Sequence, residues 1–153
     1  MEKEKKEGRY ARMYEQALSL LTKTNNPEAR MSTLVAILHH KMDYFFWTGF
    51  YMLSQGELIV RTYQGPLACQ VLTKDTGVCW AGIHGRKTIV VPDVHQFPGH
   101  IACDSRSKSE IVVPVFQKDG ILAGVLDVDS TNHNAFDETD AEWLEKFTAL
   151  VYV

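Results

Sequence analysis

The sequence has no long apolar run and no surplus of basic residues. No apolar segment approaches the roughly 18 to 20 residues that a membrane-spanning helix needs. The first residues, MEKEKKEGRY, are charged where a secretory signal would be apolar. The 16 basic and 19 acidic residues are interspersed and give a net charge of -3. We therefore predict a cytoplasmic protein that binds neither membranes nor nucleic acids.

Cysteine is also scarce. The chain has three cysteines, Cys69, Cys79 and Cys103, an odd number that cannot be fully paired within one chain. Such a count suits a reducing compartment better than a secreted disulfide scaffold. At least one thiol must stay free or cycle between oxidation states. The cysteine count alone leaves open whether the thiols are reactive or simply buried.

The length and the apolar content predict one compact domain. The chain has 153 residues, of which 45% are hydrophobic, and no linker interrupts it, so we expect a single domain over residues 1–153. Apolar residues recur at helical spacing over about 9–23 and again from Pro27 to about Met42. Asn26 is a suitable cap for the second of these helices, and Pro27 suits its first position.

After the second helix the apolar period becomes that of strands. Aromatic and β-branched residues predict strands over 44–53, 58–64, 88–91, 111–117 and 121–129. A short helix is expected over 77–86, and Asp137 with Asp140 predicts the start of a last helix. This order predicts an α+β domain with a mostly antiparallel sheet and helices on one face. The other face would be covered by residues 65–86 and the long loop 92–108, which together carry all three cysteines.

Three carboxylates are predicted to meet on one face of the sheet. Asp127 and Asp129 alternate with apolar residues, so both side chains point to the same side of their strand. If Asp119 and Gly120 are the two central residues of a hairpin turn, Glu110 lies opposite Asp129. Such crowding should raise the pKa of at least one carboxyl group. A three-residue loop would shift the register and could turn Glu110 away, and an exposed polar face is the alternative interpretation.

An aromatic pair accompanies these carboxylates. Trp47 and Tyr51 lie four residues apart on one face of the first predicted strand. An aromatic wall beside an acidic cluster describes a small-molecule pocket better than a solvent-exposed surface. The alternative is an ordinary core, because Phe46, Thr48 and Phe50 occupy the opposite face and only one face can meet the helices. We favour the pocket.

Cys103 lies in the polar, irregular stretch FPGHIACDSRSKSE. His100, Arg106 and Lys108 are near it in sequence, and cationic neighbours lower the pKa of a thiol. An attacking cysteine, a second cysteine and an acid of raised pKa are the components of two-step redox chemistry. We therefore consider Cys103 a candidate nucleophile.

A zinc site is the competing interpretation of these residues. Three cysteines and three histidines of the central part of the chain could supply ligands: Cys69, Cys79, His84, His95, His100 and Cys103. Structural zinc sites usually place their ligands in close pairs, and only His100 with Cys103 has such a spacing. We therefore predict no metal.

Five stretches carry the most specific signal in the chain. They are FWTGFY (46–51), QGPLACQVL (64–72), TGVCW (76–80), VPDVHQFPGHIACDSRSKSEIVVPV (91–115) and GVLDVDS (124–130). With these stretches the chain resembles the free methionine-(R)-sulfoxide reductases, GAF-domain enzymes that reduce the free amino acid. The combination of G-P-x-A-C, G-V-C and G-H-I-A-C-D is far more specific than a general GAF pattern. Trp80 departs from it, since a small residue is expected after G-V-C.

The resemblance implies a fold and a set of roles for the cysteines. The fold would be a six-stranded GAF sheet flanked by helices, with a loop-covered ligand pocket, and the protein would be a homodimer. Cys103 would be the nucleophile and Cys69 the resolving cysteine. Cys79 would be an auxiliary thiol that pairs with Cys69 in some oxidised forms.

The resemblance also implies how the substrate is held. Trp47 and Tyr51 would contact the methyl-sulfur end of free methionine sulfoxide. Glu110, Asp127 and Asp129 would bind its polar groups and supply a proton. No bound cofactor is implied, because an external thioredoxin would be the reductant.

A chemical sequence follows from these roles. The Cys103 thiolate attacks the sulfoxide sulfur, an acid protonates the oxygen, and Cys103 becomes a sulfenic acid that Cys69 converts to a disulfide. The alternative function is a GAF module that binds a small ligand or senses redox state without turnover. Sensor GAF domains usually accompany an output domain, for which we expect no room in this chain.

Overall fold

Five antiparallel strands form the centre of the fold. In the computed structural model, which describes residues 1–100 and 103–153, they follow the order β2-β1-β5-β4-β3. The strands are β1 (Trp47–Ser54), β2 (Glu57–Gln64), β3 (Ile89–Val91), β4 (Ser109–Phe116) and β5 (Leu122–Ser130). Ile101 and Ala102, which belong to the G-H-I-A-C-D motif and to the predicted loop 92–108, lie outside the described residues.

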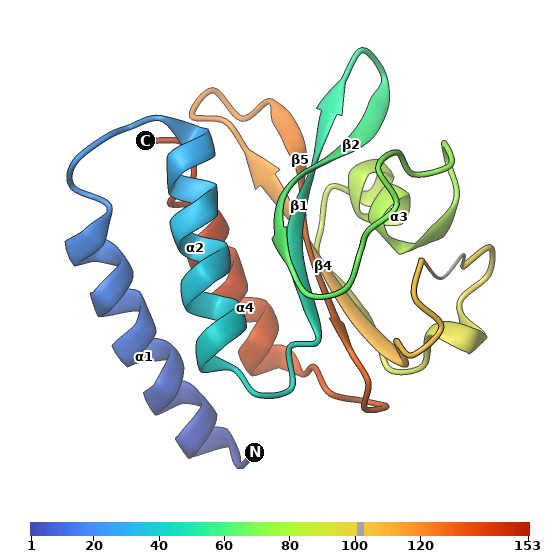
Figure 1. Cartoon of the computed structure of the whole chain (residues 1–153), viewed down its shortest axis with the longest axis horizontal. Helices are drawn as coiled ribbons and strands as arrows, with labels where there is room; N and C mark the ends of the chain where they lie inside the picture. Colours follow the sequence, from blue (N-terminus) through green and yellow to red (C-terminus); the bar gives the residue numbers. More distant parts are fainter. Residues whose placement is uncertain (101–102) are drawn as a thin grey trace.

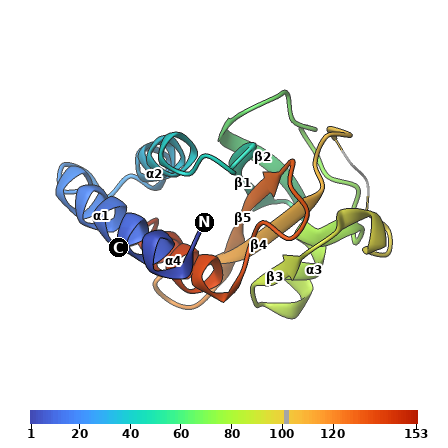
Figure 2. The same ribbon diagram turned by 90° about the horizontal axis from the view of Figure 1, so that it is seen from below.

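The helices lie on both faces of this sheet, as Figures 1 and 2 show. They are α1 (Lys3–Leu20), α2 (Pro27–Lys41), α3 (Gly77–Gly85), α4 (Glu138–Thr148) and a single 3-10 turn, η1 (Val94–Gln96). α2 and α4 pack on one face of the sheet, and α1 packs outside them. α3 and the cysteine-bearing segments lie on the opposite face. No helix within the described residues is both long and apolar enough to cross a bilayer.

The predicted α+β class and the antiparallel sheet are confirmed, but the six strands implied by the resemblance are not. Within the described residues the sheet has five strands, and the segment after β2 makes one isolated bridge, between Ile59 and Val71. The backbone around Gly65 turns away with a φ of 117°. Cys69, four residues on, is bonded to Cys103. The segment returns to β2 only at Gln70 and Leu72, which make two backbone hydrogen bonds to Val60 and Leu58, so it adds a single bridge and no sixth strand.

The caps predicted for two helices are confirmed. The Asn26 side chain accepts a hydrogen bond from the Ala29 amide, 3.1 Å away, at the start of α2. At the start of α4, Asp137 and Asp140 form a reciprocal capping box. Both helices therefore begin where the sequence pattern indicates.

The start predicted for the first helix, near residue 9, is wrong because α1 begins at Lys3. The charged N-terminal residues suggest a solvated tail, yet Lys6 is only 4% exposed. Its Nζ lies 2.7 Å from Asp140 Oδ2. The same carboxylate accepts hydrogen bonds from the hydroxyls of Tyr10 at 2.6 Å and Tyr44 at 2.5 Å. A buried ion pair thus accompanies a helix that begins about 1.7 turns earlier than predicted.

Removing the Asp140 carboxylate should destabilise the fold strongly. We expect Asp140→Ala to lower the free energy of unfolding by about 3 to 5 kcal/mol, because it leaves the buried Lys6 ammonium with only the exposed Asp137 carboxylate, 3.3 Å away, and removes the acceptor of two tyrosine hydroxyls. Urea unfolding followed by tryptophan fluorescence measures the loss. The matched control is Glu142→Ala, an exposed carboxylate of the same helix, which should change stability by less than about 0.5 kcal/mol. A loss below about 1 kcal/mol in Asp140→Ala would contradict the importance of this network.

Candidate active site

The three predicted carboxylates do share one face of the sheet, although the turn that precedes them is not the predicted one. The turn has three residues, since the Gln117 amide bonds to the Ile121 carbonyl at 2.8 Å. By itself this would shift the register. A β-bulge between Val115 and Phe116, with Ala123 as the extra residue, shifts it back. Glu110 therefore lies opposite Asp129, as predicted.

β1 brings the aromatic residues to the same face. Trp47 pairs with Asp129, and Asp129 pairs with Glu110, so these three residues form one row across three strands. Tyr51 lies four residues along β1, opposite Val125. Both aromatic side chains are buried, with Trp47 5% and Tyr51 3% exposed.

The indole of Trp47 lies flat over its own strand because of Gly49. A Cβ atom at Gly49 would stand 2.6 Å from the Trp47 ring and 2.4 Å from the Tyr63 Cβ. The indole stacks between Tyr51, with ring centroids 5.7 Å apart, and Tyr63, at 5.3 Å. The Tyr51 hydroxyl donates to the carbonyl of Cys69 at 2.9 Å. The aromatic wall is therefore joined to the segment that carries the cysteine.

A disulfide links the two segments that cover this face. Cys69 and Cys103 are bonded, with Cα atoms 5.7 Å apart across a sequence separation of 34 residues. This is the pairing that the resemblance implied. Cys103 is exposed and Cys69 half-buried, so the bond can be reached from solvent.

A cavity of about 110 Å³ lies between the disulfide and the sheet. Its lining includes both bonded cysteines, Cys79, Trp47, Tyr51, His100 and the three carboxylates Glu110, Asp127 and Asp129. All eight site residues predicted from the sequence thus border one space, and the aromatic pair faces that space rather than the helix-side core.

Burial dominates the electrostatics of the acid cluster. It raises the pKa of Glu110 well above the ordinary value, and the charges of Asp127 and Asp129 raise it further. It also raises the pKa of Asp129, to which the Asp127 charge adds. The pKa of Asp127 is raised by burial too, but hydrogen bonds from Glu110, Cys79 and Asp129 oppose the rise. Of the three carboxyl groups, Asp127 is therefore the one whose ionised form is favoured most.

Cys79 differs from the other two cysteines. It lies in the first turn of α3, is buried and has a free thiol. Burial raises the pKa of this thiol, and the charges of Asp127 and Glu110 add to the rise. Cys79 is therefore protonated near neutral pH and unsuited to nucleophilic attack. Trp80, the departure from the motif, is buried beside it and stacks on His84 with ring centroids 5.6 Å apart.

Two of the cationic side chains expected near Cys103 do not supply positive charge to its sulfur. Arg106 forms two side-chain hydrogen bonds to Asp104, at 2.9 and 2.6 Å, and these lower the pKa of Asp104 to about 2. Its guanidinium also lies over the Phe46 ring, 4.9 Å from the centroid. Burial lowers the pKa of His100, which favours the neutral ring. Sequence proximity alone thus overstated the positive charge near this sulfur.

The six residues considered for zinc are not brought together as a ligand set. Cys69 and Cys103 are bonded to each other, and His84 is paired with Asp75 at 2.7 Å. Among residues 1–100 and 103–153, the groups able to offer three ligand atoms at one point are Cys79, Glu110 and Asp127, and separately Asp93, His95 and His133. Neither group contains two cysteines.

Sequence reasoning missed two residues of the cavity and its wall. His100 was considered as a charge near Cys103 and as a zinc ligand, yet its Nδ1 lies 4.0 Å from Glu110 Oε1 and the ring lines the cavity. Its place inside the G-H-I-A-C-D motif was the available signal. Tyr63 stacks on Trp47, and the period-2 pattern of its strand could have placed it on this face.

The fold and the site define a GAF domain. The chain belongs to the GAF domain family, whose sequence pattern matches residues 24–152. It is 45% identical over 147 residues to GAF domain-containing protein A of Dictyostelium discoideum, covering 95% of this chain and 92% of that protein.

Within the GAF family, the chain is similar to relatives whose activity is named. The chain is 37% identical over 121 residues to the free methionine-R-sulfoxide reductase of Escherichia coli, covering 79% of this chain and 73% of that protein. The X-ray structure of the free methionine-R-sulfoxide reductase of Neisseria meningitidis in complex with its substrate superposes with a TM-score of 0.88 at 39% identity. That match covers 93% of this chain and 85% of the other. The resemblance drawn from the motifs is confirmed.

Proposed function

We propose that this protein reduces free L-methionine (R)-S-oxide to L-methionine. The observation that carries the proposal is the solvent-accessible Cys69–Cys103 disulfide, which borders a cavity lined by three buried carboxylates and two aromatic side chains. A disulfide in such a place is the expected product of a reaction that oxidises Cys103 beside a bound substrate. The similarity to reductases of known substrate supports the same conclusion.

The cavity offers a separate contact for each part of a small amino acid. The stacked rings of Trp47 and Tyr51 suit the methyl group and the sulfur of the substrate. The Asp127 carboxylate suits the ammonium group, which a methionine inside a peptide lacks. The indole Nε1 of Trp47 is buried and has no hydrogen-bond partner among residues 1–100 and 103–153, so it can donate to a substrate oxygen.

The reaction transfers one oxygen atom and two electrons. In the reduced protein the Cys103 thiolate attacks the sulfoxide sulfur, and the sulfur–oxygen bond breaks as the oxygen passes to Cys103, giving a sulfenic acid and methionine. The Cys69 thiol then attacks the sulfenic sulfur, water leaves, and the disulfide forms. An external dithiol restores both thiols.

We assign the proton for the departing oxygen to Glu110. A sulfoxide oxygen leaves poorly unless it is protonated, so an acid with a proton near neutral pH is required. Burial and two neighbouring carboxylates raise the pKa of Glu110, which supports this role. Asp129 has a raised pKa as well and is the alternative donor.

Thioredoxin is the proposed reductant, and the exposure of Cys103 supports attack by a dithiol protein. A homodimer is proposed from the resemblance, and a cytoplasmic location from the charged N-terminal residues and the cysteine count.

A coupled assay with separated diastereomers tests the function. We expect thioredoxin, thioredoxin reductase and NADPH to support turnover of free methionine (R)-S-oxide, and we expect no turnover of the S form or of N-acetylated methionine sulfoxide. Dithiothreitol in place of thioredoxin, with methionine measured by chromatography, tests the reaction apart from the choice of reductant. No methionine with either reductant would favour the GAF sensor instead.

A further inference from the structure

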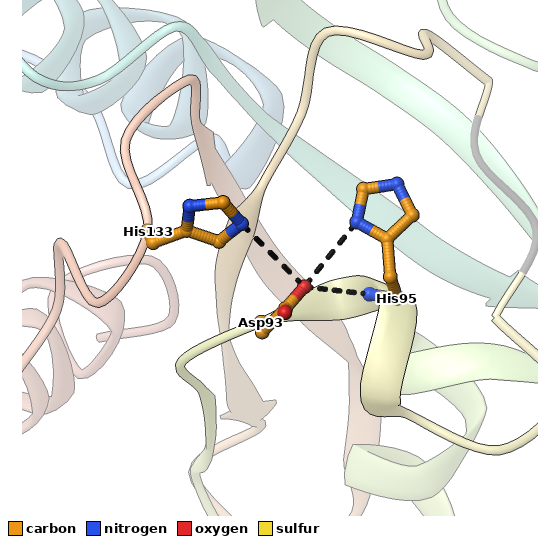
Figure 3. A group of neighbouring side chains, drawn as sticks. All are labelled: Asp93, His95 and His133. Carbon is orange, nitrogen blue, oxygen red and sulfur yellow. Dashed lines mark hydrogen bonds and ion pairs between the residues drawn. The ribbon is translucent and has the colours of Figure 1, made fainter.

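Three ligand-type side chains meet outside the cavity. Asp93 directly precedes η1, His95 lies in η1, and His133 lies in the turn after β5 (Figure 3). The Oδ1 atom of Asp93 is 3.2 Å from Nδ1 of His95 and 3.7 Å from Nε2 of His133. The ligand atoms of all three lie within 4.8 Å of one another.

Backbone groups fix the two segments that carry these side chains, residues 93–95 and the turn that contains His133. Oδ1 of Asp93 also accepts a hydrogen bond from the His95 amide at 3.0 Å, which fixes the carboxylate relative to η1. Val94, between the two ligands, is fully buried. The Asn134 amide, next to His133, donates to the carbonyl of Pro92 at 2.8 Å. The two segments are thus joined by the main chain immediately beside the ligands.

The spacing of the three atoms fits the coordination shell of a transition metal. Tetrahedral zinc with bonds of about 2.0 to 2.2 Å to nitrogen and oxygen has its ligand atoms about 3.4 Å apart. The two distances from Asp93 lie on either side of this value. Both imidazole rings are more than half exposed, so their side chains can rotate to close the remaining gap.

We propose that Asp93, His95 and His133 form a binding site for a divalent transition-metal ion such as Zn²⁺. Two imidazole nitrogens and one carboxylate oxygen suit zinc and its neighbours in the first transition series. Calcium and magnesium prefer oxygen ligands, so two imidazole nitrogens and one carboxylate would bind them weakly. The exposure of the site leaves a fourth position for water or for another ligand.

The site is separate from the proposed catalytic centre. None of the three residues lines the cavity beneath the disulfide. A bound ion would instead join the start of the loop 92–108, which carries Cys103, to the turn after β5. Its effect would therefore fall on the stability of the fold and on the position of this loop.

Another histidine–carboxylate pair provides the contrast. His84 and Asp75 are both exposed and lie 2.7 Å apart, but no third ligand-type side chain joins them among the described residues. If Asp93, His95 and His133 form a metal site, zinc should bind there and not at the His84–Asp75 pair. Simple surface ion pairing would give no such difference.

Isothermal titration of the tag-free, disulfide-bonded protein with zinc chloride tests the proposal. The oxidised form is used because its bonded Cys69 and Cys103 cannot compete for zinc, and the other three-ligand group, Cys79 with Glu110 and Asp127, is buried. We expect one saturable site in the wild type. Binding should weaken roughly 100-fold or more in His133→Ala and in His95→Ala, because loss of a direct ligand costs at least as much as loss of an outer-shell partner. His84→Ala should bind as the wild type does. Absence of saturable binding in the wild type, or unchanged binding in both variants of the cluster, would overturn the proposal.

Nuclear magnetic resonance of the imidazole groups gives an independent measure. The ring resonances of His95 and His133 should shift together on addition of one equivalent of Zn²⁺, while those of His84 stay in place. If the largest shifts occur at His84 instead, the assigned ligands are wrong.

Discussion

Replacing Cys103 with serine should reduce methionine formation at least about 10³-fold, to the background of the assay, because a hydroxyl cannot take the place of the attacking thiolate. The loss should occur in the first turnover as well as in steady state. Rapid quench of the reduced protein with excess methionine (R)-S-oxide, followed by chromatography, measures both phases.

Cys69→Ser should separate the two halves of the cycle. Cys103 remains able to attack, so about one methionine should be released per chain before the reaction stalls at the sulfenic acid. A dimedone adduct on Cys103, detected by mass spectrometry, identifies the stalled form. Ser105→Ala, an exposed neighbour of Cys103, is the control and should retain full turnover. Equal and full activity of both cysteine variants would refute the assigned roles.

Replacing Glu110 with glutamine should reduce turnover about 10²- to 10⁴-fold, the usual contribution of a positioned general acid. Glutamine keeps the shape of the side chain but has no carboxyl proton to give to the departing oxygen. The measurement is the rate of a single turnover under saturating substrate. Asp129→Asn, measured in parallel, tests the alternative donor, and a larger loss there than in Glu110→Gln would transfer the role to Asp129.

The same substitution should change how stability depends on pH. The pKa of Glu110 is raised in the folded protein, so the folded state keeps its proton while the unfolded chain loses its proton near pH 4.3. The stability that the protonated group contributes is therefore complete below about pH 4.3 and is lost as pH rises through the folded pKa. The slope is at most about 1.4 kcal/mol per pH unit for one proton.

Urea unfolding between pH 4 and 8 detects this difference. Glu110→Gln should match the wild type most closely at pH 4 and gain stability relative to it as pH rises. Glu57→Gln on β2, where the carboxylate is exposed, is the matched control and should follow the wild-type curve. A constant offset between Glu110→Gln and the wild type at all pH values would show that the carboxyl group titrates normally.

The sequence predicts the strands and the face of the site well, because period-2 alternation fixes which side chains point together. Glu110, Asp127 and Asp129 were placed correctly even though the predicted two-residue turn was wrong. The error had no consequence because the bulge at Ala123 compensates for the longer turn. No propensity in the sequence marks that bulge, since it depends on how β5 pairs with β4.

Contacts formed only in the folded chain explain the other differences between the sequence predictions and the structure. The first helix starts early because Lys6 meets Asp140, 134 residues away, and no local pattern carries that information. The charge near Cys103 was overestimated because Arg106 turns back to Asp104. The cluster of Asp93, His95 and His133 was only partly considered, because His133 comes close to the other two only after β5 has crossed the sheet.

The compensation at the β4–β5 hairpin constrains how the chain can change length. Losing one residue from the loop before Ile121, with the bulge kept, would reverse the facing of β4 relative to β5 and point Glu110 into the helix-side core. Losing Ala123 alone would also shift the register by one residue, with the opposite sign, and would likewise reverse the facing. Only the loss of one loop residue together with Ala123 would preserve the site. In variants of this sequence, a two-residue turn should therefore occur together with a β5 strand that lacks the bulge.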